Sequence, residues 1–483
     1  MKRTTKPKQC PRVSLSALAI AVTTLVAGGC ALQPAYTPPT TTSPSAWSVP
    51  AAEKPVAEHT TMDRWWNALH DPAVDVLVDL AMVANPTLAQ TVARIDEARA
   101  TLGLSASAGA LSLSASVSTA QAQVQNTAAS QQGITMRSHS ADFGPALNRE
   151  VDLFGRIRHS VDAAQYRLDA RTADAATVRL SLAADVVGGV LYLRACAHTG
   201  TVLADDLASR EKTLALTRRK LLAGSAAPAD EARGISGIAA VHTKLAAQKE
   251  QCTRQLNALA ALTGKDAATV REQIFGTGAI SSFMPSAPNA APELPAIVLA
   301  RHPSVVSADR EAAAAWEEIG VARANRLPRL DLAAVLTGQW VRAAGSSFDF
   351  TTWSIGPALT GTVLDGGAGA ANVNAAEARY RRAVAGLQGT LRSTVQEVEN
   401  ALAAQASAQD RTVSAGEAVT AARTTLRTSE SQWQAGTISL FELEDSRRQF
   451  ASAQDDEISA RRDHALAWVG LIKASAGAIT ATP

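Results

Sequence analysis

Four stretches of the chain alternate apolar with polar residues, which is the pattern of β-strands that have one apolar face. Their apolar members are Leu111, Leu113, Ala115 and Val117; Phe143, Pro145 and Leu147; Leu330, Leu332, Ala334 and Leu336; and Trp353, Ile355, Pro357 and Leu359. This alternation suits either a soluble hairpin with one buried face or a membrane barrel with an apolar outer surface. Because single-chain barrels begin at about eight strands, four lipid-facing strands would require an oligomer.

Two much longer stretches, from Arg156 to Leu222 and from Ala370 to Ala435, contain no proline. The chain is rich in alanine, the best helix former, and aromatic residues make up only 4% of it. We therefore predict two closely packed helices, each about 100 Å long at a rise of about 1.5 Å per residue. Helices of this length suit a helical tunnel, and a solid coiled-coil rod is the alternative.

Each long helix is followed by a glycine-containing turn and then by a second helix. The turns are Gly224 to Glu231 and Gly436 to Asp445, where glycine closes one helix and a hydroxyl or acidic residue begins the next. One order of elements therefore occurs twice: short helix, two strands, very long helix, tight turn and long helix. The copies are assigned to residues 61–266 and 294–476, with a connector at 267–293 and a C-terminal tail at 477–483.

The beginning of the chain has the pattern of an export signal. Basic residues precede an uncharged stretch that ends in LVAGGC at residues 25–30, so we predict a lipoprotein signal peptide at residues 1–29 and lipidation of Cys30. Ala27 departs from the leucine that is usual there, and an ordinary signal peptide or a transmembrane anchor is the alternative. Residues 30–60 are rich in Pro, Thr and Ser and predict a lipid-anchored tether. No later segment has about 20 consecutive apolar residues, so a membrane-spanning mature chain would use strands.

Charge and motifs exclude several classes of function. The 46 basic and 44 acidic residues give a net charge of +2, and no basic run predicts nucleic-acid binding. The eight His residues have no metal-ligand spacing, and no Gly-x-Ser-x-Gly elbow is present. Glu311, Glu317 and Glu318 have no evident His or Arg partner, so we expect them on a solvated helix face. We therefore predict no enzyme activity, no cofactor and no metal.

Three motifs resemble the TolC-like outer-membrane efflux proteins. They are WWNALHDP at Trp65 to Pro72, EVDLFGRIR at Glu150 to Arg158 and GTISL at Gly436 to Leu440. With the lipidation motif at Cys30, they resemble the NodT-type lipoprotein branch of the RND efflux outer-membrane factors. The resemblance implies a mainly α fold with a small β part. In such a homotrimer, four strands per chain contribute to a twelve-stranded transmembrane β-barrel that continues as an α-barrel of long helical hairpins.

The same resemblance implies the function of a passive exit duct for small molecules, set in outer-membrane lipid and extending into the periplasm. Its partners would be a periplasmic adaptor protein and an inner-membrane pump, for which the RND type is expected. A type I protein-secretion duct uses the same fold and is one alternative, because a fold does not fix a function. A lipid-anchored coiled-coil structural or adaptor protein is the alternative from another class, and lipid-facing strands argue against it.

In this family the two helical turns form the periplasmic tip, where the tunnel narrows and an adaptor docks. By this resemblance, the docking residues are Gly224, Ser225, Gly436, Thr437 and Ser439. The constriction is expected at Phe441, Glu442 and Asp445, with Asp230 at the equivalent place in the first copy. Rings of carboxylates favour cations, and a ring of apolar side chains can gate a pore. The alternative is that these acids only begin solvated helices.

Two of the four cysteines belong to the mature helical region. Cys10 lies in the signal peptide and Cys30 is the expected anchor, which leaves Cys196 and Cys252. These two are equally far from Gly224, so an antiparallel helical hairpin would bring them to the same height. Because disulfides persist in an oxidising periplasm, we predict a Cys196–Cys252 bridge. Two buried free thiols are the alternative.

Overall fold

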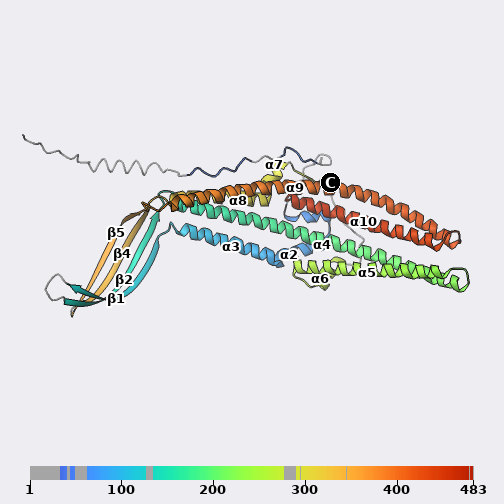
Figure 1. The fold of residues 1–483 in the computed structure, drawn as a ribbon, viewed down its shortest axis with the longest axis horizontal. Coiled ribbons are helices and arrows are strands. Elements are labelled where there is room, and N and C mark those ends of the chain that lie inside the picture. Colours follow the sequence, from blue (N-terminus) through green and yellow to red (C-terminus); the bar gives the residue numbers. More distant parts are fainter. Residues whose placement is uncertain are drawn as a thin grey trace, which may run out of the picture. The chain divides into compact units, whose positions relative to one another are not determined.

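The computed structural model of the chain (Figure 1) describes residues 33–40, 44–48, 62–126, 134–276, 290–293, 295–343, 345–477 and 479–481. The predicted signal peptide and the predicted lipidation site Cys30 lie outside the described residues. The described chain divides into two compact units. The first unit contains residues 96–169, 310–385 and the described residues up to Pro39, and the second contains the remainder.

A four-stranded antiparallel sheet belongs to the first unit. Its order is β1 (Ser112–Asn126), β2 (Ile134–Val151), β4 (Arg329–Ala343) and β5 (Ser346–Thr360). The register places Leu113 opposite Leu147, Leu147 opposite Ala334, and Ala334 opposite Ile355. Because directly opposed residues point to the same face of a sheet, the apolar sets of all four strands share one face.

Two acidic residues mark the points where strands lead into the long helices. Asp152 accepts hydrogen bonds from the backbone N–H groups of Ile157 and Arg158, at 3.2 and 2.8 Å, and so caps α4 (Arg156–Leu222). Asp365 has the same role before α9 (Ala368–Gln434), where its carboxylate accepts from Gly367 and Gly369 at 2.8 and 2.7 Å. These backbone donors lower the pKa of Asp365. A carboxylate at this position also interacts favourably with the positive end of the helix dipole.

The helical hairpins of the second unit are formed by the later parts of α4 and α9 with α5 (Pro228–Thr263) and α10 (Leu440–Ala474). Gly224 and Gly436 close the first helix of each pair with φ angles of +71° and +77°, which glycine adopts without strain. Within the described residues, α4 has one 18-residue window apolar enough to span a membrane. However, 61% of that window is buried inside the chain, as in the core helix of a soluble protein.

The largest core cluster of the second unit surrounds Trp468 of α10, which is fully buried. Trp65 of η1 (Met62–Leu69) meets Trp468 edge-on with ring centroids 5.6 Å apart. The helix α2 (Pro72–Ala84) packs Leu77 and Val78 into the same cluster. The paired tryptophans of the WWNALHDP motif are therefore core residues, which explains why so large a side chain occurs twice in succession there.

The two copies differ from the expected order at their beginnings. The first copy has η1, α2 and α3 (Pro86–Ser107), with a 46° bend between α2 and α3, and the second has α7 (Pro295–Arg301) and α8 (Pro303–Ala324). The expectation of a single short helix was incomplete, because Pro86 and Pro303 each interrupt a helix and begin the next. The connector contains α6 (Ala267–Phe275) and β3 (Ala290–Pro292), and β3 pairs with β6 (Ile479–Ala481) of the C-terminal tail.

A buried ion pair joins the start of α2 to α4. Arg194 donates to Asp71 at 2.9 Å, and the two side chains are only 8% and 2% exposed. Asp71 also accepts from the backbone N–H of Ala73 at 3.1 Å and so caps α2. One carboxylate therefore fixes the start of a helix and neutralises a buried guanidinium.

Replacing Arg194 by Met should lower the free energy of unfolding by about 3–5 kcal/mol, because Asp71 would remain buried without its cation. Thermal unfolding of the purified protein followed by circular dichroism measures this loss as a lower melting temperature. Arg254→Met is the matched control, since the Arg254–Glu250 pair is 79% and 64% exposed and exposed pairs contribute about 0–1 kcal/mol. Equal melting temperatures for the two variants would contradict the expectation.

Candidate functional site

The apolar face of the sheet is exposed to solvent in a single chain. The large apolar side chains that are 38–75% exposed on this face include Leu113, Val117, Phe143, Leu147, Leu336, Trp353, Ile355 and Leu359. The opposite face carries Ser112, Ser114, Ser116 and Ser118 on β1 and Thr352 and Ser354 on β5, interrupted near the β4–β5 turn by Phe348 and Phe350. An apolar face of this size is not expected in contact with water, so it marks a lipid or protein contact.

The height of the apolar face matches a membrane. On β2 the apolar face begins after Arg149 and ends before His139, which lies opposite Arg342 of β4. At about 3.4 Å per residue and a strand tilt of about 40°, this segment spans roughly 25 Å. The apolar band of transmembrane strands has about the same height.

Both edges of the sheet are open within the described residues. β1 and β5, each 15 residues long, form the two edges, and each has one neighbouring strand. An edge strand presents a row of unpaired N–H and C=O groups, which cannot be left unsatisfied in lipid. The equal length of the two edges allows them to pair with each other when copies of the chain meet.

At the second helical turn, two of the predicted gate acids are engaged within their own helix. Glu442 accepts from the backbone N–H of Ser439 at 2.8 Å, while the Ser439 hydroxyl accepts from the Glu442 N–H at 3.3 Å. Asp445 accepts from Arg448 and, at 2.7 Å, from Gln449. Phe441 projects from the same helix start and is 59% exposed. The tip therefore presents a free aromatic ring beside partly neutralised carboxylates.

The first helical turn is built in the same way. Asp230 accepts from the backbone N–H of Ala227 at 3.3 Å and from Arg233 at 3.2 Å. Ser225 donates its hydroxyl to the carbonyl of Lys220 at 3.0 Å, as Thr437 of the second turn donates to Gln432 at 2.9 Å. The hydroxyl groups of Ser225 and Thr437 thus close the preceding helices, whereas that of Ser439 begins the next helix. A side chain at Gly224 or Gly436 would meet no neighbouring atom, so both turn surfaces are open.

An arginine network near the tip was not found by sequence reasoning. Arg210 of α4 pairs with Asp206 at 2.9 Å and with Glu444 of α10. Arg447, which is 8% exposed, donates to Thr213 of α4 at 2.6 Å and to Glu444 at 3.1 Å. These contacts tie the second hairpin to the first. The i,i+3 spacing of Glu444 and Arg447 was a local signal, but their partners in α4 lie more than 200 positions away in the sequence.

Cys196 of α4 and Cys252 of α5 form a disulfide with Cα atoms 5.6 Å apart. This is the pair that their equal distance from Gly224 predicted. Cys196 is 4% exposed, and its carbonyl accepts from the side chain of Gln248 at 2.9 Å. The first hairpin is therefore cross-linked part-way along its length.

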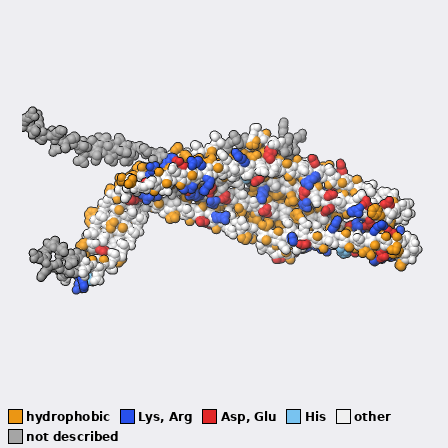
Figure 2. Space-filling view, in the orientation of Figure 1, with side chains coloured by type: hydrophobic (Ala, Val, Ile, Leu, Met, Phe, Trp, Pro, Cys, Tyr) orange, Lys and Arg blue, Asp and Glu red, His pale blue; other side chains and the backbone are white. Residues whose placement is uncertain are grey.

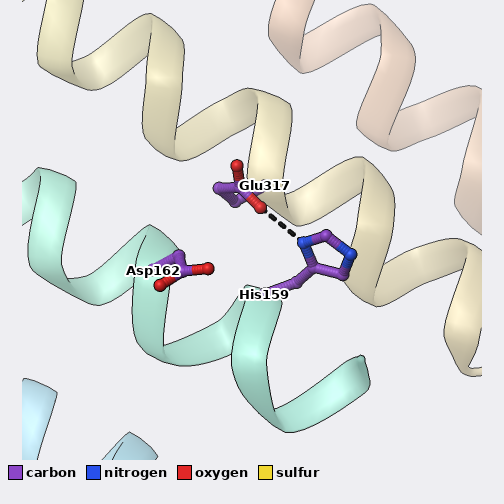
Figure 3. A group of neighbouring side chains, drawn as sticks. All are labelled: His159, Asp162 and Glu317. Carbon is purple, nitrogen blue, oxygen red and sulfur yellow. Dashed lines mark hydrogen bonds and ion pairs between the residues drawn. The ribbon is translucent and has the colours of Figure 1, made fainter. Parts of the chain in front are cut away.

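A buried cluster contradicts one expectation from the sequence. Glu317 of α8 is 6% exposed and its Oε2 lies 2.5 Å from Nδ1 of His159 in α4, with Asp162 beside them (Figure 3). Glu318 pairs with Arg379 at 3.2 Å and with Arg167. The prediction that Glu317 and Glu318 lie on a solvated face without partners is therefore wrong. Burial raises the pKa of Asp162, and the nearby Glu317 charge raises it further.

Elsewhere the surface carries both signs of charge. Figure 2 shows basic and acidic side chains interspersed over the helices, in agreement with the net charge of +2. An antiparallel sheet with an exposed apolar face, continued by helices of 67 residues, defines the class of outer-membrane channel proteins with a helical tunnel. The family described as "Outer membrane efflux protein" matches residues 77–265 and 294–477, and the chain belongs to this family.

Relatives and solved structures agree with this assignment. Outer membrane protein OprJ of Pseudomonas aeruginosa is 29% identical over 414 residues, covering 82% of this chain and 81% of OprJ. Nodulation protein T of Rhizobium leguminosarum bv. trifolii is 26% identical over 438 residues, covering 89% and 90%. The structure of the outer-membrane channel OprN has a TM-score of 0.81 at 25% identity and covers 93% of this chain and 99% of OprN. The predicted resemblance and the TolC-like fold class are confirmed.

Substitution on the apolar face should prevent membrane assembly. We expect Ile355→Arg to cost about 2–4 kcal/mol if this face meets lipid near the bilayer centre. The matched control is Ser354→Arg, one residue away on the opposite face of β5. Recovery of each variant in the outer-membrane fraction, measured by immunoblot, should fall for Ile355→Arg alone. An equal loss for both variants would contradict the prediction that the face with Ile355 meets lipid and the face with Ser354 does not.

The disulfide gives a separate prediction. Under denaturing conditions without reductant, an alkylating reagent should label neither Cys196 nor Cys252, and both should be labelled after dithiothreitol. Peptide mass spectrometry identifies the labelled residues. The Cys252→Ser variant should free the Cys196 thiol and lower the free energy of unfolding by about 2–4 kcal/mol. Labelling of both residues without reductant would establish free thiols instead.

Proposed function

We propose that three copies of this chain form a channel through the outer membrane, in which β5 of each copy pairs with β1 of the next. Three four-stranded sheets then close a barrel of about twelve strands, which leaves no edge unpaired in lipid. The exposed apolar face with two open edges is the observation that carries this proposal. The apolar residues face the bilayer, and the serine- and threonine-rich face lines the lumen.

The helical hairpins continue this channel as a tunnel on the periplasmic side. Each long helix of 67 residues extends about 100 Å at a rise of about 1.5 Å per residue. Such a length spans far more than a membrane, whose apolar core is about 30 Å thick. The channel carries out no chemistry and uses no cofactor. Solutes move through it passively, and the energy comes from an inner-membrane pump, for which we propose the RND type.

The tip of the tunnel is the proposed constriction and docking surface. Phe441 and Asp445 of three copies form an apolar ring and an acidic ring, which together narrow the pore and favour cations. The open turns at Gly224 and Gly436 receive a periplasmic adaptor. Arg210 and Arg447 tie α10 to α4, so the second hairpin can move outward only if their contacts with Glu444 and Thr213 break.

The N-terminal segment supplies the remaining part of the proposal. Cys30 carries lipid chains, and residues 30–60 form a tether between the membrane and the first helix. A lipid anchor favours small-molecule efflux. The alternative is a type I protein-secretion duct, which has the same fold. A lipid-anchored coiled-coil protein would have no use for an exposed apolar sheet.

The proposed function is tested by single-channel recording of the purified protein in planar bilayers. The native protein should give a small conductance with cation preference, because the constriction limits the current. The double variant with Phe441→Ala and Asp445→Ala should conduct several-fold more and lose part of the preference. Asp456→Ala is the matched control, because Asp456 is an exposed acid of α10 away from the turn, and it should behave as the native protein.

Two outcomes would contradict the proposal. A monomeric mass in detergent together with silent bilayers would exclude the trimeric channel. The protein could also conduct while the double variant and the Asp456→Ala control behave alike. This result would support the channel but contradict a constriction at the second turn.

A further inference from the structure

We propose that His159, Asp162 and Glu317 bind one divalent first-row transition-metal ion of the zinc type between α4 and α8. The proposal does not depend on the transport function. It concerns a cluster in the first unit that has no part in the membrane face or in the hairpin turns. Neither the family assignment nor the proposed function explains why three ionisable side chains should be collected there.

The geometry brings three potential ligands together from two helices. His159 and Asp162 are three residues apart in α4 and therefore lie on one side of that helix, and Glu317 faces them from α8 (Figure 3). One ligand atom from each residue lies within 4.8 Å of the other two. Zinc is commonly held by three protein ligands of the His and carboxylate type, with water in the fourth position.

The charges of the cluster are unbalanced without a cation. Nδ1 of His159 faces Glu317 and is the nitrogen that would bind the ion, whereas Nε2 is buried without a partner and would take no part in the site. A neutral imidazole in turn leaves the two carboxylates without a buried positive charge. Arg158 interacts with Asp162 electrostatically, but its side chain is exposed to solvent. A divalent ion would neutralise both carboxylates at once and take a lone pair of the imidazole.

The surrounding backbone holds the imidazole in place. A Cβ at Gly320 of α8 would come within 2.6 Å of the His159 ring, and one at Gly155 within 3.2 Å. Glycine at these positions therefore allows the two helices to close on the ring. Nδ1 of His159 and Oε2 of Glu317 are 2.5 Å apart, whereas two ligands of a tetrahedral zinc ion are roughly 3.3 Å apart. The Glu317 carboxylate would have to move away from Nδ1 by about 1 Å, and the Asp162 ligand atom, which lies within 4.8 Å of the other two, would have to approach by up to about 1.5 Å.

The position of the cluster gives the ion a structural role. α4 follows β2 in the chain, and α8 leads into β4, the strand that pairs with β2. An ion shared by the two helices would tie the first repeat to the second, between the helix that follows β2 and the helix that precedes β4. Loss of the ion should therefore weaken the first unit without altering the hairpin turns.

Titration with zinc sulfate tests the site on the full-length protein, purified without a histidine tag and first treated with a chelator. Isothermal titration calorimetry and elemental analysis should give one zinc ion per chain. His159→Gln and Glu317→Gln should each weaken binding at least 10-fold, whereas His242→Gln should not, because His242 is an exposed histidine of α5. Zinc should raise the melting temperature of the native protein and of the His242→Gln variant only.

Cobalt provides a measurement that needs no variant. Co²⁺ bound to the native protein should show the intense visible absorption of a four-coordinate site, and zinc should abolish it. No stoichiometric zinc on the native protein would overturn the proposal. Zinc bound as tightly by correctly folded His159→Gln and Glu317→Gln variants would also overturn it. In either case the cluster would be a buried pair in which the hydrogen bond between His159 and Glu317 joins α4 to α8.

Discussion

The open edges of the sheet are the constraint on which the rest of the structure depends. In lipid every backbone N–H and C=O must be paired within protein, and four strands cannot do this alone. The exposed side chains of Trp353 and Ile355 require a lipid or protein partner for the apolar face, while the free edges of β1 and β5 require another strand. Closure among copies would pair the edges and would leave the apolar face turned outward for lipid to cover, and it would place the strand-to-helix connections around one common axis.

The connections between sheet and helices show how a few residues control the architecture. Asp152 and Asp365 occupy equivalent places in the two copies, and each caps a helix of 67 residues. Farther along, contacts between the first and second repeats of one chain hold the helices, such as the hydrogen bond from Arg447 to Thr213. Long helices with few aromatic side chains pack closely. Polar contacts such as that between Arg447 and Thr213 then determine how the second hairpin packs against the first.

The buried cluster at His159 differs in character from these structural contacts. Arg194 and Asp71 form a pair in which opposite charges balance, and the same carboxylate begins a helix. His159, Asp162 and Glu317 bring two acids and one imidazole together, and the imidazole retains an unpaired nitrogen. A metal ion shared by α4 and α8 would join the two repeats without an added cross-link.

The sequence by itself determined the strands, the long helices, the helical turns and the Cys196–Cys252 pairing, because each depends on local periodicity or on distance along the chain. It did not determine the partners of Glu317, Glu444 or Arg447, which lie on other helices far away in the sequence. Only the tertiary structure decided that Glu317 is buried against His159. A helical pattern gives the face on which a residue lies, but the neighbour of that face depends on the packing of the whole chain.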